Sequence, residues 1–262
     1  MESPIANRVA AIYDIHGNLP ALDAVLREID RHDVDLILVG GDVASGPMPR
    51  PTIERLMGLG DRADFVRGNT DRLLVGHFDS SLSKDARDDD VWFQRDRWAS
   101  EQITKLQRDF LDGFSGSRSL EIEGLGSVLF CHGSPRSDEE IITAKTPARV
   151  LRDALGAVEQ RLVVCGHTHM QFVRSLDDVR IVNPGSVGMP YEGSPGAYWA
   201  LLGPEVSLKR TDYDFGEAAR SFSASGFPEV DDLIDGVFYN PPSQDETTRT
   251  FERRAEEQRA LN

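Results

Sequence analysis

Residues 8–30, RVAAIYDIHGNLPALDAVLREID, join a short apolar run to an amphipathic pattern and indicate the fold class. The run from Arg8 to Tyr13 is typical of a buried strand. From Asn18 to His32, apolar side chains recur every three or four residues, which predicts a helix with one buried face. A strand that leads directly into a helix is the first half of a β-α-β unit, so the segment predicts an α/β fold with a parallel sheet.

The same alternation continues through the first third of the chain. Residues 35–39 and 64–67 are predicted strands, and residues 51–59 are a predicted helix that begins with proline. From 73 to 114 the pattern becomes all-helical, and we interpret this segment as an insertion with a solvated acidic loop at 85–90. Its Trp92 and Trp98 either form a cap over a pocket or pack on the body of the protein, and packing is favoured.

The second half of the sequence is rich in strands. Residues 120–123 and 127–131 flank a Gly124-Leu-Gly126 turn, which predicts a hairpin. A helix is expected near 146–160. Further strands are predicted at 162–165, 172–175, 180–182, 197–202 and 206–211. We expect antiparallel pairing at the end of this series, one domain over residues 1–240 that includes the insertion, and a charged helix or frayed tail over 241–262.

The composition excludes some classes of protein. With 44 acidic and 29 basic side chains, the net charge is -15, which argues against a general nucleic-acid binder because such binding depends on basic side chains. No stretch approaches the roughly 20 apolar residues of a membrane helix. The first apolar segment leaves no room for a signal peptide, so we expect a cytoplasmic protein. The two cysteines, Cys131 and Cys165, are expected to be buried thiols. Self-association is left open.

Polar groups follow five of the predicted strands, at the edge where open α/β sheets bind ligands. They are Asp14-Ile-His16-Gly-Asn18, Gly40-Gly-Asp42, Gly68-Asn69-Thr-Asp71, Cys131-His132-Gly133 and Gly166-His167-Thr-His169. Four of the six histidines of the chain fall in these groups. Each motif alone is weak, since an Asp or a Gly-Asp pair usually caps a helix or forms a turn. Their convergence predicts one site.

The residue types in these groups indicate a metal site. Carboxylate, amide and imidazole groups without a thiolate suit Mn²⁺, Fe or Zn²⁺ better than Cu(I) or Ca²⁺. The set is larger than one such ion takes, which predicts two ions. A pair of ions about 3.5–4 Å apart clamps the attacking and leaving oxygens of a displacement at phosphorus. The sequence therefore predicts hydrolysis of phosphoesters.

The ordered set resembles the calcineurin-like metallophosphoesterases, whose signature is D-x-H, G-D, G-N-H-[DE], a lone His and G-H-x-H. Residues 40–47, 66–69 and 182–187 are similar to the bacterial branch of small phosphodiesterases and phosphoesterases. The resemblance implies a four-layer α/β/β/α sandwich with two metal ions at one edge. It also implies a role for each residue: Asp14, His16 and His169 would hold the first metal, Asn69, His132 and His167 the second, and Asp42 would bridge them.

One position departs from that signature. Many members of the family have a histidine after the metal-binding asparagine, and this chain has Thr70. A threonine hydroxyl is a poor general acid near pH 7. We therefore expect substrates with good leaving groups, such as phosphoanhydrides or aryl esters, or a proton donor from elsewhere, with Asp71 and His77 as the nearby candidates.

Three further features have two interpretations each. Arg67 and Arg72 either contact substrate oxygens or form surface ion pairs. The segment Asn183-Pro-Gly-Ser186 either approaches the phosphate or is a tight turn after a strand.

The function predicted from these observations is hydrolysis of phosphodiesters or phosphoanhydrides by a hydroxide that bridges two divalent ions. Asp42, Asn69, Thr70 and Asp71 are the candidate catalytic residues, Mn²⁺ is the favoured ion, and Fe, Zn, Ni and Co are alternatives. We expect a small phosphoester or nucleotide-type substrate. The alternatives are a phosphomonoesterase or protein phosphatase, which Thr70 disfavours, a nuclease, which the net charge disfavours, and a non-catalytic protein-binding scaffold like a retromer subunit of similar fold, which would have no need of all seven ligands.

Overall fold

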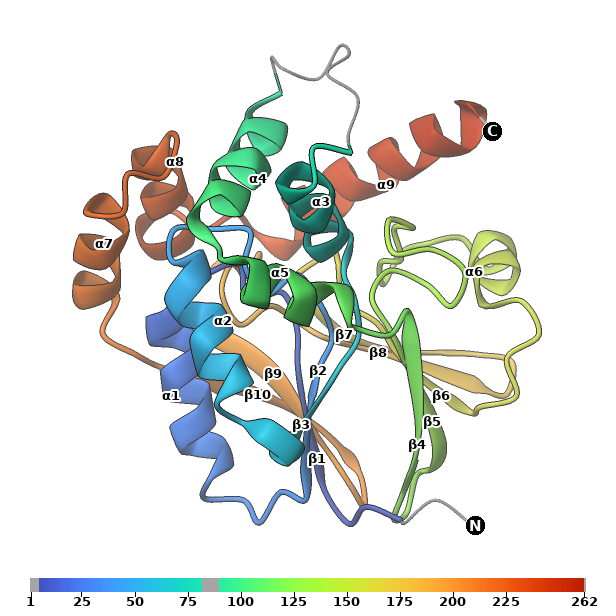
Figure 1. Cartoon of the computed structure of the whole chain (residues 1–262). Helices are drawn as coiled ribbons and strands as arrows, with labels where there is room; N and C mark the ends of the chain where they lie inside the picture. Colours follow the sequence, from blue (N-terminus) through green and yellow to red (C-terminus); the bar gives the residue numbers. More distant parts are fainter. Residues whose placement is uncertain (1–4, 82–89, 262) are drawn as a thin grey trace.

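The protein is described by a computed structural model that covers residues 5–81 and 90–261. Two five-stranded sheets pack face to face, with helices on both outer faces (Figure 1). This arrangement confirms the α/β fold class and its four layers. The cluster between the sheets contains the apolar side chains Leu38, Phe130 and Val182. Within the described residues no helix has the length and apolarity needed to cross a membrane.

The first sheet contains the strands of the β-α-β pattern. In order across the sheet, its strands are β10 (Val206–Thr211), β9 (Ala197–Leu202), β1 (Val9–Ile12), β2 (Leu36–Val39) and β3 (Ala63–Phe65). β1, β2 and β3 are parallel, and β9 is antiparallel to both β1 and β10. The predicted parallel start and antiparallel end are both confirmed.

The second sheet contains the predicted hairpin. Its strands, in order, are β4 (Ser117–Ile122), β5 (Gly126–Cys131), β6 (Leu162–Val164), β8 (Val179–Pro184) and β7 (Gln171–Leu176). β5, β6 and β8 are parallel, whereas β4 and β7 are antiparallel edge strands. Consequently, the carboxyl ends of β1, β2, β5 and β6 come together at the top of the two sheets in Figure 1.

The side chains of β1 alternate between the two faces of the first sheet, which explains why a hydrophobic core lies on each side of it. Ala10 and Ile12 face outward against α1 (Leu19–Ile29) and α2 (Pro49–Met57), while Val9 and Ala11 face the second sheet. Successive side chains of a strand point to opposite faces, so a four-residue apolar run contributes to both layers. Asn18 caps α1 by accepting a hydrogen bond from the backbone N–H of Ala21.

The outer face of the second sheet is covered by α6 (Ala148–Leu155), which is shorter than the predicted helix. Leu151 and Leu155 of this helix pack with Cys131 and Cys165, which are buried free thiols as expected. A glycine at position 156 with φ of 60° ends the helix.

The segment predicted as a helical insertion, 73–114, begins inside α3 (Asn69–Phe78) and contains α4 (Val91–Gln102) and α5 (Lys105–Asp112). A short 3-10 helix, η1 (Gly60–Arg62), precedes α3. Leu74, Ala99 and Leu111 extend the outer core of the first sheet. Trp98 packs against this core, whereas Trp92 is 44% exposed. Of the predicted acidic loop, residues 85–89 lie outside the described part of the chain.

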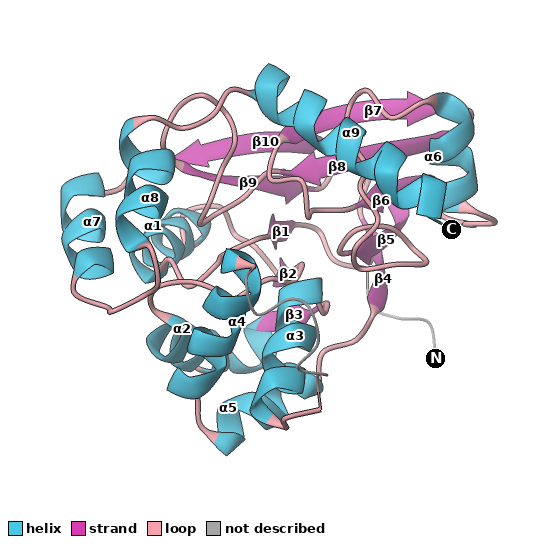
Figure 2. Ribbon diagram, turned by 90° about the horizontal axis from the view of Figure 1, so that it is seen from above, coloured by secondary structure: helices cyan, strands magenta, loops and turns pink. Residues whose placement is uncertain are grey.

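The C-terminal region contains helices that the sequence patterns did not predict: α7 (Phe215–Ser223), α8 (Val230–Ile234) and a π-helical turn, η2 (Asp235–Tyr239). They share a small core in which Phe222 and Phe238 pack with Met189. The final helix, α9 (Gln244–Leu261), lies on the side of the second sheet, and α7 and α8 lie on the side of the first (Figure 2). α9 is docked, because the hydroxyls of Thr143 and Thr146 both donate to Glu252.

Candidate metal centre

The seven side chains expected to bind metal lie together at the carboxyl ends of the strands, and we call this part of the molecule the ligand edge. Six of them form two groups, and within each group the potential ligand atoms lie within 4.8 Å of one another. The first group is Asp14, His16 and His169, and the second is Asp42, His132 and His167. The seventh, Asn69, begins α3, and its Oδ1 atom lies 3.1 Å from Nε2 of His132.

Backbone carbonyls orient three of the four imidazole rings. Nδ1 lies 3.0 Å from the carbonyl oxygen of Ser45 in His16, 2.8 Å from that of Gly40 in His132, and 2.7 Å from that of Met189 in His169. A carbonyl only accepts, so the hydrogen-bond network assigns a proton to each Nδ1. In the neutral ring, each Nε2 is then a lone-pair donor directed into the site, as in metal-binding histidines.

Asp42 lies between the two groups. Its Oδ2 atom is 3.4 Å from Nε2 of His132 and 3.7 Å from Nε2 of His16, one from each group. Its other oxygen accepts a hydrogen bond of 2.9 Å from the backbone N–H of Thr70. This leaves Oδ2 oriented toward both groups, the position that a bridging carboxylate requires.

A buried oxygen without a hydrogen-bond partner tests whether the site fits a metal ion. Oδ1 of Asp14 is fully buried and accepts no hydrogen bond, and Nε2 of His169 and Nε2 of His132 lie 3.5 and 3.8 Å from it, whereas Oδ2 accepts a hydrogen bond of 3.1 Å from the backbone N–H of His167. An unpartnered buried carboxylate oxygen is costly unless a cation compensates it. Together with the nitrogen and oxygen donors around it, this atom fits a divalent transition metal.

Five of the ligand residues have left-handed backbone conformations. Asp14, His16, Asp42, His167 and His169 have φ values between 46° and 65°. Few residues other than glycine adopt this region, and such residues concentrate at functional sites because surrounding contacts must stabilise them. The left-handed turns let the chain leave each strand sharply while the side chain stays over the site.

Close backbone approach explains one of the glycines next to these ligands. A Cβ atom on Gly68 would lie 2.1 Å from Oδ1 of Asp42. Only glycine leaves room for the loop before α3 to pack on this carboxylate.

The charges of the site shift one another's pKa values. Burial alone would raise the pKa of Asp14 and Asp42, but the neighbouring histidines, His169 for Asp14 and His132 for Asp42, hold both below 3.8. Burial alone would lower the pKa of His132, yet Asp42 raises it to about 10. Burial and the charge of His132 lower the pKa of His167 to about 4. His132 must release its proton before Nε2 binds a cation.

Asp71 has a different place from the one expected of a proton donor. Its two oxygens accept hydrogen bonds of 2.9 Å from the backbone N–H groups of Asp42, Val43 and Gly68. Burial, followed by the charge of Asp42, raises its pKa to about 6. With both oxygens directed at the loops, Asp71 holds Asp42 and Gly68 in position and does not face the site.

Thr70 and His77 are the other residues that bear on protonation of a leaving group. The hydroxyl of Thr70 is buried and has no hydrogen-bond partner. His77 packs edge-on against Phe93 of α4, with ring centroids 4.5 Å apart. These contacts do not favour Asp71 or His77 as a proton donor, and that role stays a prediction.

For Arg72 and for the segment around Ser186, the contacts in the structure decide between the two interpretations. Arg72 makes a bidentate ion pair with Asp138 and a further contact with Glu139, so it is a surface ion pair. Ser186 donates to the backbone oxygen of Asp14 and accepts from the N–H of Met189, which makes its segment a tight turn. For Arg67, which is half-buried, contact with a substrate stays a prediction.

Three residues near the ligands were missed by the sequence patterns. The ring of Tyr191 stacks on His169 at 4.9 Å, with an interplanar angle of 14°. Phe251 of α9 lies 6.5 Å from the ring of His167. Asp96 of α4 is buried and accepts from the hydroxyl of Ser45, and burial raises its pKa to about 7. Of these three, only Asp96 could have been noticed from the sequence, as an acidic residue on the buried side of a predicted helix.

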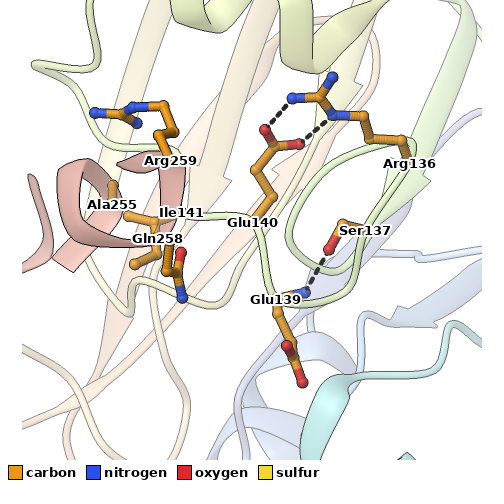
Figure 3. A pocket seen from close by; sticks show the side chains of 8 residues that line it. All are labelled: Arg136, Ser137, Glu139, Glu140, Ile141, Ala255, Gln258 and Arg259. Carbon is orange, nitrogen blue, oxygen red and sulfur yellow. Dashed lines mark hydrogen bonds and ion pairs between the residues drawn. The ribbon is translucent and has the colours of Figure 1, made fainter. Parts of the chain in front are cut away.

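A cavity of about 550 Å³ lies apart from the ligands, between α9 and the loop after β5 (Figure 3). Arg136 and Glu140, which line it, pair with each other, with Nε of Arg136 2.8 Å from the carboxylate. No ligand-edge residue lines this cavity. It therefore contributes nothing to the metal centre.

The sequence and the fold are similar to those of known proteins. The model of the calcineurin-like phosphoesterase superfamily domain matches residues 8–203. The chain is 26% identical over 249 residues to MJ0912 of Methanocaldococcus jannaschii, covering 86% of this chain and 96% of that protein. It is 26% identical over 208 residues to the phosphodiesterase YfcE of Escherichia coli, covering 74% and 87%. A metallophosphoesterase structure from Sphaerobacter thermophilus superimposes with a TM-score of 0.67 at 28% identity, covering 87% and 97%.

Proposed function

The chain belongs to the calcineurin-like phosphoesterase superfamily, and from this premise we propose that it hydrolyses phosphodiester or phosphoanhydride bonds with two divalent metal ions. Two histidine–carboxylate groups carry the proposal, because Oδ2 of Asp42 lies near a histidine of each group. Asp14, His16 and His169 would hold one ion, Asn69, His132 and His167 the other, and Asp42 both. Bound there, the ions would activate water and neutralise charge on the phosphoryl oxygens.

The protein's own groups set the geometry of this reaction. The carbonyls of Ser45, Gly40 and Met189 fix three imidazole rings, so the positions of the Nε2 atoms do not depend on side-chain rotation alone. Asp71 holds the loops of Asp42 and Gly68 through three backbone N–H groups. The Asn69 amide, whose oxygen lies 3.1 Å from Nε2 of His132, would contact a phosphoryl oxygen. Such preorganisation avoids reorganisation at the moment of reaction.

Diesters rank first among the substrates for two reasons. YfcE, to which the chain is similar along 208 residues, is a phosphodiesterase. In addition, Thr70 stands where many family members have a histidine, and the contacts of Asp71 with backbone N–H groups and of His77 with Phe93 favour a reaction that needs no replacement proton donor. We therefore propose a small phosphoester or nucleotide-type substrate with a good leaving group, Mn²⁺ as the preferred ion, a cytoplasmic location, and a catalytic domain over residues 1–240. Retention of the full ligand set argues against a non-catalytic scaffold.

The proposal is tested by hydrolysis of bis(p-nitrophenyl) phosphate beside p-nitrophenyl phosphate. Metal-stripped protein would be assayed with and without Mn²⁺, and the bound ions would be counted by elemental analysis. We expect two ions per chain and metal-dependent turnover that favours the diester. Binding of two ions without turnover of either ester would contradict the proposal.

The role of position 70 is tested by Thr70→His. If the missing imidazole limits the reaction, the variant should hydrolyse alkyl monoesters about 100-fold faster, at the low end of what a positioned general acid contributes. Thr70→Ser is the matched control, because it keeps a hydroxyl without adding an acid. Equal rates in Thr70→His and the unmodified protein would show that leaving-group protonation does not limit turnover.

A further inference from the structure

A cavity of about 250 Å³ opens beside the first group of ligands and is separate from the metal positions. Its walls come from three parts of the chain. Trp92 and Arg95 belong to α4, Met189 and Tyr191 to the loop after β8, and Asp232 and Leu233 to α8. α8 lies beyond residues 8–203, so this wall is outside the segment that the superfamily model matches.

Direct contacts connect this cavity to the metal centre. The carbonyl of Met189 accepts from His169, and the N–H of Tyr191 donates to the backbone oxygen of His169 over 3.2 Å. The ring of Tyr191 also stacks on the imidazole of His169. In addition, Trp92, Met189 and Leu233 border a narrow crevice that reaches His16. A group attached to a phosphate at the ligand edge therefore lies within reach of the cavity.

The size of the cavity and its side chains indicate the occupant. Drug-sized ligands fill roughly 300–1,000 Å³, so a smaller space suits one ring system better than a long chain. Trp92 and Tyr191 supply aromatic surface, and Leu233 an apolar wall. Arg95 is held rigidly, because it donates to the carbonyls of Pro228 and Glu229 and its guanidinium lies 4.8 Å over the ring of Trp92.

The carboxylate of Asp232 distinguishes a heteroaromatic ring from a hydrocarbon. Asp232 lines the cavity and is exposed, so it remains able to accept a hydrogen bond from a ligand. A hydrocarbon ring has no donor for this carboxylate. A nucleobase supplies both an aromatic face for stacking and ring or amino N–H donors.

We propose that this cavity, the base pocket, binds the nucleobase of a nucleotide-type substrate whose phosphate lies at the ligand edge. The proposal deepens the proposed function and rests on it for the reaction. The recognition itself depends on Trp92, Tyr191, Leu233 and Asp232. It assigns selectivity to α4 and α8, which are not ligand-bearing segments.

Two esters with the same leaving group test the pocket. Thymidine 5′-(p-nitrophenyl phosphate) and ethyl p-nitrophenyl phosphate both release p-nitrophenolate, and they differ in the arm that remains on phosphorus. We expect kcat/KM with Mn²⁺ to be about tenfold higher for the thymidine ester, the scale that stacking of one base gives. Leu233→Trp, which fills the pocket, should bring this ratio close to one.

A matched control and a second variant guard against misfolding. Leu106 is 68% exposed on α5, so Leu106→Trp makes the same substitution away from the pocket and should preserve the ratio. Trp92 is 44% exposed, and Trp92→Ala should lower the ratio by removing a stacking surface without opening a core. A ratio near one in the unmodified protein, or an unchanged ratio in both pocket variants, overturns the proposal.

A binding measurement separates the pocket from the proposed reaction. Saturation-transfer NMR with thymidine and metal-stripped protein needs neither phosphate nor metal. We expect saturation of the thymine protons with the unmodified protein and with Leu106→Trp, and its loss with Leu233→Trp. If neither ester is hydrolysed, saturation of the base upholds the pocket while the proposed function fails. If neither ester is hydrolysed and no saturation occurs, the pocket proposal falls as well.

Discussion

The ligand edge and the helices that cover it are held in place by different kinds of contact. At the ligand edge, backbone groups hold the side chains, as the carbonyl of Gly40 holds His132 and the N–H of Thr70 holds Asp42. The cover helices, which we define as α4, α8 and α9, attach through side chains far apart in sequence. Glu252, for example, accepts from Thr143 across 109 residues.

This difference separates the chemistry of the protein from its selectivity. Backbone hydrogen bonds and left-handed turns give the ligand edge one arrangement, so small changes there are expected to destroy the site. The cover helices contact the edge through a few side chains, such as Asp96 of α4, which accepts from the hydroxyl of Ser45, and Phe251 of α9 against His167. Changes in the cover should therefore alter stability and selectivity while the metal centre persists.

We expect the largest effect on the ligand edge from substitution of Asp42. Asp42→Asn removes the charge shared by the two ligand groups, and we expect kcat to fall by at least about 10⁴-fold, which corresponds to more than roughly 5 kcal/mol. The fold should persist, because Asn keeps an oxygen for the N–H of Thr70. Steady-state kinetics and metal analysis measure the effect, with exposed Asp61→Asn as the matched control. Undiminished turnover with both metals bound would refute the role of Asp42.

The cover is tested by Asp96, whose pKa is raised to about 7 by burial. The folded protein holds this proton more tightly than the unfolded chain. The stability that protonated Asp96 contributes is therefore fully present below about pH 4 and is lost as pH rises toward 7. Asp96→Asn cannot ionise and still accepts from Ser45. We expect the variant to be about 3–4 kcal/mol more stable at pH 8 and close to the unmodified protein at pH 4.

Urea unfolding at pH 4, 6 and 8 measures this effect. Asp71, whose pKa is also raised, is present in both proteins and cancels from the difference. Asp61→Asn again serves as the control, with no expected change in the pH profile. A variant that is less stable than the unmodified protein at pH 8 would show that the Asp96 carboxylate is paired in a way that the Ser45 contact does not reveal.

Substitution of Gly68 tests how far catalysis depends on the exact position of the Asp42 carboxylate. In Gly68→Ala, a Cβ atom would meet Asp42 Oδ1 at 2.1 Å, so the loop or the carboxylate must shift. A displacement of about 1 Å near reacting groups costs about 100-fold in rate, and we expect that loss in kcat. Gly58→Ala is the matched control, since Gly58 is exposed and has φ of -67°. Equal rates in the two variants would mean that the edge adapts more than the comparison implies.

The difference between the ligand edge and its cover helices also explains which features could be predicted from the sequence. The strands of both sheets were predicted because apolar runs such as 9–12 are short and end in turn residues. The ligand residues were found because each lies within a few positions of a strand end, where the parallel arrangement brings them together. Position alone thus sufficed to predict the convergence of His16 and His132, which are 116 residues apart.

The parts that escaped prediction depend on contacts that leave no local pattern. Asp71 reads as a polar residue near the site, and only the fold shows its oxygens bound to N–H groups of two loops. α8 has five residues and gains its stability from packing on Phe222 and Met189. Helices this short are not stable alone, so their sequences carry little helical signal. Tyr191 likewise meets His169 only through the turn after β8.

The smallest expected effect concerns α9, where Phe251 contacts the ring of His167 and, at 6.3 Å, that of Tyr191. Phe251→Ala removes this half-buried ring and should lower the free energy of unfolding by about 1 kcal/mol, part of the cost of a fully buried one. Because the backbone of the ligand edge does not depend on α9, metal stoichiometry should stay at two and kcat/KM should change only a few-fold. Arg253→Ala, exposed on the same helix, is the control. Loss of a metal ion in Phe251→Ala would mean that α9 completes the second ligand group, and the edge and its cover would then be one functional unit.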